Sequence, residues 1–107
     1  MKKKLIAIID AQFGNLASVI NSIKYLGYEY EVVKKPTKIK AYSHFILPGV
    51  GSYKKAAKNL HFLGWHKAIK DLTESSTPFL GICLGMQLMF EEGEENGTIK
   101  GLGLFKG

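Results

Sequence analysis

Phe79-Leu80-Gly81-Ile82-Cys83-Leu84-Gly85 joins an apolar run to a cysteine that stands between two glycines. The run Phe79–Ile82 predicts a buried strand, and the residues that follow predict a helix through Met86–Glu91. A nucleophile on such a strand–turn–helix elbow projects above the carboxyl edge of a sheet, and the flanking glycines prevent clashes across the turn. The helix N-terminus lowers the pKa of a thiol there. The alternative, a buried structural cysteine, is less consistent with this context.

Strands alternate with helices before this stretch. Leu5–Ile9 is a continuous apolar run, which is typical of a strand buried on both faces of a parallel sheet. Apolar residues then recur at helical spacing from Leu16 to Leu26, and Gly27 is placed to end that helix. The following segments are predicted to be a strand, a loop or poorly formed short helix, and a strand that ends before Pro48: Tyr28–Val33, Lys34–Tyr42 and His44–Leu47.

Two further amphipathic helices and a last strand continue the alternation. Ser52 is a potential N-cap for the first of these helices. Gly64 separates it from the second, which ends in the segment Ser75–Pro78, and Asn96-Gly97 predicts a turn before a last strand over Thr98–Phe105. The buried faces are predicted to hold Tyr53, Ala56, Ala57 and Leu60 in the first helix and Trp65, Ala68, Ile69 and Leu72 in the second. This order predicts an α/β fold with a mainly parallel sheet flanked by helices.

Composition excludes several classes of protein. The formal charge of +6 comes from 15 lysines and no arginine, and the lysines are scattered instead of forming the stripe typical of nucleic-acid binding. No apolar run approaches the ~20 residues of a membrane span, and the apolar run after Met1–Lys4 is too short for a signal peptide. The single cysteine excludes an intrachain disulfide and a multi-cysteine zinc site. We therefore expect a cytoplasmic protein without a nucleic-acid or membrane partner, a metal or a cofactor.

Two further polar or glycine-rich features lie close to predicted strand ends. Pro48-Gly49-Val50-Gly51 follows an apolar strand, and its glycines allow the backbone to approach a ligand and direct N–H groups at it. In a parallel sheet this loop lies at the same carboxyl edge as Cys83. Gln87 stands among apolar residues after the cysteine, either facing solvent or placed to hydrogen-bond a ligand.

These motifs together resemble a known family. Gly81–Gln87 is similar to the cysteine elbow of the class I, triad-type glutamine amidotransferases, Leu47–Gly51 to their oxyanion-strand motif, and Asp10–Asn15 to their opening segment. Within the family, Phe79–Glu91 and Gly101–Leu104 most resemble the glutaminase subunits of imidazole glycerol phosphate synthase, which act in histidine biosynthesis. Amidotransferases of surface-sugar biosynthesis look much alike. The resemblance runs from Leu5 to the last residue and implies a flavodoxin-like domain.

The resemblance implies a catalytic role for Cys83. In the family the corresponding thiolate attacks the carboxamide carbon of glutamine and forms a glutamyl thioester. The backbone N–H of Leu84, together with an N–H from Val50 or Gly51, is implied to hold the oxyanion. The ammonia released would pass to a synthase or cyclase subunit, so the resemblance also implies a heterodimer.

The resemblance assigns other residues to binding. Gln87, the backbone at Gly49, and Glu95 are implied to bind the substrate glutamine, with Glu95 suited to its α-ammonium group. Glu95 could equally be one of the acidic residues of a solvated Glu91–Glu95 turn. Gly14 and Asn15 are implied to face the synthase partner.

The chain also departs from the family pattern. The family completes its triad with a His and a Glu well beyond the cysteine, whereas His44, His61 and His66 all precede Cys83 and are expected to be surface or packing residues. We therefore expect residues 1–107 to form the amino-terminal part of a single amidotransferase domain that is inactive alone. Ala11 stands where the family often has Tyr, which affects expected partner contacts. A non-catalytic interaction module and a redox or stress protein with a cysteine elbow remain alternatives.

Overall fold

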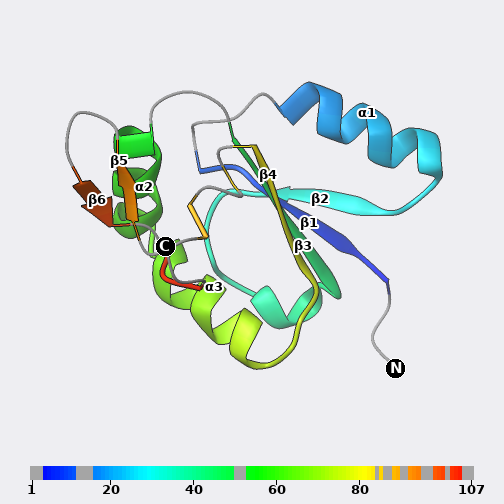
Figure 1. Ribbon diagram of the computed structural model, residues 1–107. Helices are drawn as coiled ribbons and strands as arrows, with labels where there is room; N and C mark the ends of the chain where they lie inside the picture. The colour runs from blue at the N-terminus through cyan, green and yellow to red at the C-terminus, as the bar shows by residue number, and fades with distance from the viewer. Residues whose placement is uncertain are drawn as a thin grey trace.

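A parallel sheet of four strands forms the centre of the molecule (Figure 1). The computed structural model describes residues 4–11, 16–49, 53–83, 85, 88–89, 92–94, 98–100 and 102–104. The strands lie in the order β2-β1-β3-β4, and every neighbouring pair is parallel. Their bounds are Ile6–Ile9 for β1, Tyr30–Val33 for β2, His44–Gly49 for β3 and Phe79–Cys83 for β4. The predicted α/β class with a mainly parallel sheet is confirmed.

Helices cover both faces of this sheet (Figure 1). On one face, Ile8 and Ile46 pack with Ile23 of α1 in a small apolar cluster. On the other, alternate residues of the same strands join the main core with the buried residues of α2 and α3. The bounds are Leu16–Leu26 for α1, Tyr53–Phe62 for α2 and Trp65–Glu74 for α3, with a short 3-10 helix, η1, over Ile39–Ala41. Among the described residues, no helix is both long and apolar enough to cross a membrane.

Local sequence signals set the helix ends and the buried faces. Gly27 has φ +79°, its N–H donates to Lys24 O, and the N–H of Tyr28 donates to Ile23 O. These bonds form a Schellman motif, which ends α1 at the position that Gly27 predicted. The predicted buried faces of α2 and α3 are confirmed in full, and Trp65 is completely buried with its indole N–H donating to Lys34 O at 3.0 Å.

Strand β3 is longer than predicted, because Pro48 does not end it. Pro48 pairs with Ile82 and Gly49 pairs with Cys83 in the ladder to β4. The N–H of Phe45 donates to Pro78 O, so the odd-numbered residues of β3 direct their backbone groups at β4 and Pro48 faces the β1 side. The β1 ladder ends at Ile46, and the missing N–H of Pro48 therefore removes no ladder bond.

The carboxyl-terminal elements also differ from the predictions. Of the predicted helix Met86–Glu91, the structure describes Leu88 and Met89, and these lie in a turn. Glu92–Glu94, which was predicted as part of a solvated Glu91–Glu95 turn, forms strand β5, and β5 pairs antiparallel with β6 over Thr98–Lys100. The predicted strand does not continue to Phe105: Gly103 has φ +69°, and the N–H groups of Leu102 and Leu104 donate to Leu88 O and Met89 O. The predicted Ser52 cap and Asn96-Gly97 turn lie outside the described residues.

Candidate active site at the carboxyl edge of the sheet

Gly49 and Cys83 are register partners at the ends of β3 and β4. The two strands are adjacent and parallel, so the segments that follow them leave the sheet at the same edge. The Pro48–Gly51 motif and the cysteine elbow are therefore neighbours in space although Gly49 and Cys83 lie 34 positions apart in the sequence. This edge of an open α/β sheet is where such folds bind ligands.

The two glycines of the elbow are required by close backbone approach. A Cβ on Gly81 would lie 2.5 Å from Met89 Sδ and 2.9 Å from the backbone of Gly85. A Cβ on Gly85 would overlap the carbonyl oxygen of Leu47, in the neighbouring strand β3. The predicted clash across the turn is confirmed for Gly81, which faces the backbone of Gly85, whereas Gly85 is required because the elbow folds tightly against β3.

The segment after β1 also belongs to this edge, because β1 lies beside β3. The N–H of Asp10 donates to Val33 O at 2.9 Å, and the side-chain amide of Asn59 donates to Ala11 O at 3.2 Å. Asn59 lies on α2, the helix that follows the Pro48–Gly51 motif. It ties the opening segment to that helix across 48 residues, and no local signal in the sequence indicates this contact.

The structure describes only part of the predicted site. Gly49 is buried at the end of β3, and the backbone of Cys83 ends β4. The other predicted site residues lie outside the described residues: Gly14, Asn15, Val50, Gly51, Leu84, Gln87 and Glu95. Their roles stay predictions.

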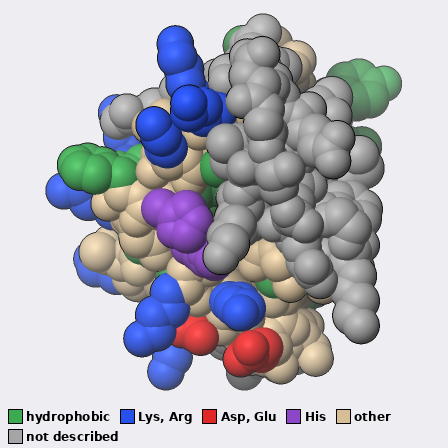
Figure 2. All heavy atoms as spheres, turned by 60° about the vertical axis from the view of Figure 1, so that its left-hand side comes forward, with side chains coloured by type: hydrophobic (Ala, Val, Ile, Leu, Met, Phe, Trp, Pro, Cys, Tyr) green, Lys and Arg blue, Asp and Glu red, His purple; other side chains and the backbone are tan. Residues whose placement is uncertain are grey.

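The three histidines are placed as surface and packing residues. His44 begins β3, at the opposite end of that strand from Gly49, and its Nδ1 lies 2.7 Å from Ser43 Oγ. His61 and His66 meet edge to face at the α2–α3 corner, with ring centroids 4.3 Å apart. Figure 2 shows histidine side chains together on one face, with lysine side chains on either side. No group of three or more metal-ligating side chains occurs among the described residues.

The environment of His66 disfavours its charged form. Burial of the ring, the neighbouring His61 and the Lys70 ammonium group all lower the pKa of His66. Its Nδ1 is buried and has no hydrogen-bond partner among the described residues. The His66 ring is therefore predominantly neutral at pH 7.

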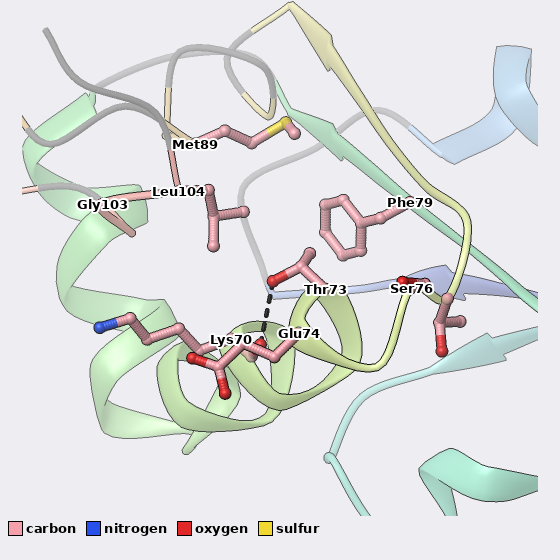
Figure 3. Close-up of a pocket in the computed structure, with 9 residues that line it drawn as sticks. Lys70, Thr73, Glu74, Ser76, Phe79, Met89, Gly103 and Leu104 are labelled. Carbon is pink, nitrogen blue, oxygen red and sulfur yellow. Dashed lines mark hydrogen bonds between the residues drawn. The ribbon is translucent and has the colours of Figure 1, made fainter.

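A separate cavity of about 460 Å³ lies near the beginning of β4, at the other end of the strand from Cys83 (Figure 3). Phe79, Met89 and Leu104 give it an apolar wall, and Lys70 and Glu74 lie on the α3 side. This cavity is distinct from the edge where Gly49 and Cys83 meet.

The sequence matches the family model described as glutamine amidotransferase class-I over residues 7–100. The chain therefore belongs to the class-I glutamine amidotransferase family. It is 48% identical to the imidazole glycerol phosphate synthase subunit HisH of Bacillus subtilis over 103 residues, which are 96% of this chain and 49% of that protein. The HisH subunit of Sulfurimonas denitrificans is also 48% identical, with 96% of this chain and 50% of that protein covered. The chain thus spans about half the length of these relatives.

Solved structures agree with the family assignment at the level of the fold. A structure titled as a glutamine amidotransferase superposes with a TM-score of 0.78 at 21% identity, over 92% of this chain and 52% of that one. PurLQS from Thermotoga maritima superposes with a TM-score of 0.62 at 23% identity, over 79% of this chain and 42% of that one. The shared architecture is the flavodoxin-like α/β fold that the sequence predicted.

Proposed function

We propose that this chain supplies the nucleophile-bearing part of a glutaminase that hydrolyses glutamine to glutamate and delivers ammonia to a synthase subunit. The register pairing of Gly49 with Cys83 carries the proposal, because it puts the oxyanion-strand motif beside the cysteine elbow. The HisH relatives favour imidazole glycerol phosphate synthase, in histidine biosynthesis, as the enzyme it serves. In this proposal the chain works in the cytoplasm as one subunit of a heterodimer.

The proposed chemistry begins at Cys83. Its thiolate attacks the carboxamide carbon of glutamine, and the negative charge that develops on the carboxamide oxygen is held by the N–H of Leu84 and an N–H of Val50 or Gly51. The intermediate collapses when the leaving nitrogen is protonated, which releases ammonia and leaves a glutamyl thioester. Water then hydrolyses the thioester to glutamate and regenerates the thiol.

Substrate and partner contacts complete the proposal. Gln87, the Gly49 backbone and Glu95 bind glutamine, with the Glu95 carboxylate paired to the α-ammonium group. Gly14 and Asn15 face the synthase subunit. The Asn59–Ala11 hydrogen bond holds the beginning of the segment that leads to Gly14 and Asn15 on α2.

Residues 1–107 form the amino-terminal part of one amidotransferase domain in this proposal. The chain matches about half of each HisH relative, and none of its three histidines follows Cys83 in sequence. The base that takes the thiol proton and returns it to the leaving ammonia would come from the unmatched half, because nucleophile and base act as a unit.

The decisive experiment restores that half covalently. We would fuse residues 1–107 to the unmatched carboxyl-terminal part of the Bacillus subtilis HisH relative and measure glutamate release with the other subunit of that synthase. Glutamate release that the Cys83→Ser variant abolishes is the expected result. A correctly folded fusion without Cys83-dependent glutamate release would contradict the proposal. Activation by a surface-sugar synthase subunit, and not by this one, would reassign the ammonia acceptor.

A further inference from the structure

Strand β2 forms an edge of the sheet, and one side of its backbone is open. Among the described strands, β2 pairs only with β1. The N–H of Asp10 donates to Val33 O, so the odd-numbered residues of β2 direct their backbone groups at β1. Because these groups alternate along a strand, those of Tyr30 and Val32 point away from β1. An edge of this kind is a template for pairing with a further strand.

Exposed apolar side chains are concentrated next to this edge. Helix α1 leads directly into β2 (Figure 1). Six large apolar side chains are exposed among the described residues, and four of the six belong to the last turn of α1, the segment after it or β2: Tyr25, Leu26, Tyr28 and Val32. Val32 lies on the α1 face of the sheet, because its register partner Ile8 packs with Ile23 of α1. Such a concentration of exposed apolar groups is typical of an interaction surface.

A second copy of the chain can add to this edge through a two-fold axis, which sets the two β2 strands antiparallel. In an antiparallel pair, residues that bond each other both direct their backbone groups across the interface. In β2 these residues are Tyr30 and Val32, so the axis must pass through a residue and not between two residues. The possible positions of the axis within the strand are therefore Tyr30, Glu31, Val32 and Val33.

The charges of this segment disfavour two of these positions, and the end of the strand disfavours a third. An axis at Tyr30 sets Glu29 opposite Glu31 of the second copy, and an axis at Glu31 sets the two Glu31 side chains opposite each other. Like charges directly opposite across a ladder are destabilising. An axis at Val33 makes its central bonds to Lys34, which lies beyond the end of β2 and whose carbonyl oxygen already accepts a hydrogen bond from an indole N–H of α3.

An axis at Val32 suits both the backbone and the charges. The two Val32 residues bond each other reciprocally, N–H to C=O, and their side chains, each 39% exposed in the single chain, meet on the α1 face. Glu31 then lies opposite Val33, so no carboxylate faces another. Glu29 lies opposite Lys35 of the second copy, and the two-fold symmetry forms this pair of opposite charges twice.

We propose that β2 is a homodimer interface, in which two copies of this chain pair antiparallel about Val32 with Glu29 of each opposite Lys35 of the other. The two four-stranded sheets would then form one continuous sheet. The inference goes beyond the proposed function and uses none of the residues assigned to the glutaminase. β2 also lies at the opposite edge of the sheet from β4, which carries Cys83.

The other edge strand, β4, is less suited to a second copy. It holds no charged residue, so it offers no pair of charges that would select a register. Its exposed large apolar side chain is Leu80. The β4 edge therefore serves as the control for the β2 edge.

Sedimentation equilibrium of the 107-residue chain and of the fusion described above, over a range of concentrations, tests the interface. We expect a monomer–dimer equilibrium in both proteins. Val32→Pro should abolish the dimer, because it removes the N–H at the centre of the interface. That N–H faces away from β1, so the ladder within each copy keeps its bonds.

Two control variants make this test specific to β2. Val32→Ile keeps the N–H and an apolar side chain and should dimerise like wild type. Leu80→Lys, which alters the other edge strand, should also dimerise like wild type. A concentration-independent monomer of either unmodified protein, or a dimer that survives Val32→Pro, would overturn the inference.

Exchange of the charges tests the register. Glu29→Lys and Lys35→Glu, each alone, should weaken the dimer at least about fivefold, because each change sets like charges opposite each other twice. Mixing the two variants should restore association, because both pairs in the mixed dimer are again of opposite charge. Both positions lie outside β2, so neither change alters the strand itself. Single variants that dimerise like wild type, or a mixture that associates no better than its components, would overturn the inference.

Discussion

Gly85 lies so close to Leu47 that a Cβ on the glycine would overlap the leucine carbonyl oxygen. The contact joins the residue two positions after Cys83 to the strand that leads into the Pro48–Gly51 motif. The elbow and the oxyanion-strand motif are therefore held together by backbone contact as well as by the β3–β4 ladder.

The first prediction concerns this contact. Gly85→Ala should lower the free energy of unfolding by about 1 to 3 kcal/mol, because the added methyl group forces the backbone of the elbow away from Leu47. Gly27→Ala is the control: a Cβ there meets open space, and only the positive φ of +79° adds a cost, about 1 to 2 kcal/mol. Urea unfolding measures both variants. Wild-type stability and wild-type Cys83 reactivity in Gly85→Ala would show that the elbow is looser than the structure indicates.

The second prediction concerns the thiol. The pKa of Cys83 should lie below the ~8.5 of a free cysteine, because the predicted helix N-terminus after the elbow favours the thiolate. Because the chain has a single cysteine, the rate of iodoacetamide alkylation against pH reports this residue alone. The urea-unfolded chain supplies the reference titration. A midpoint in the folded chain at or above that of the unfolded chain would indicate a buried structural thiol.

The third prediction concerns the isolated chain. Residues 1–107 alone should show no substantial glutaminase turnover, because losing triad members usually costs ~10⁴ to 10⁶ in rate. Glutamate release would be measured on the purified chain with and without a synthase subunit. Turnover on the order of 1 s⁻¹ that disappears in Cys83→Ser would mean that an upstream histidine serves as the base.

The fourth prediction concerns pH. Because the folded chain lowers the pKa of His66, the unfolded chain takes up a proton at a pH where the folded chain does not. This histidine therefore reduces stability as pH falls below ~6.5, the pKa of an unperturbed histidine, and has no such effect above it. The urea midpoint should drop between pH 7.5 and 5.5 by less in His66→Gln than in wild type. An identical pH dependence of the urea midpoint in His66→Gln and wild type would refute the role of His66.

Local chemistry alone determined much of the fold. Gly27 ended α1, the apolar spacing fixed the buried faces of α2 and α3, and the apolar run Leu5–Ile9 gave a strand in which Ala7, Ile8 and Ile9 are buried. Of the elbow glycines, Gly81 was also correctly interpreted, because a Cβ there would meet the backbone of Gly85, four positions along the chain. These features share one physical basis: each depends on residues within a few positions of one another.

Other features depended on contacts between distant segments. Strand β3 extends through Pro48 because the shorter β1 ladder leaves that side of the proline free. Beyond β6 the chain turns, because Gly103 has a positive φ and the N–H groups of Leu102 and Leu104 donate to the turn at Leu88 and Met89. The sequence predicted that Gly49 and Cys83 would share an edge, but their register pairing and the Asn59–Ala11 bond were set by how the strands and helices pack. A strand register that pairs residues 34 positions apart, or a hydrogen bond across 48 positions, leaves no periodic trace in the chain, because only the folded backbone brings the paired groups within reach.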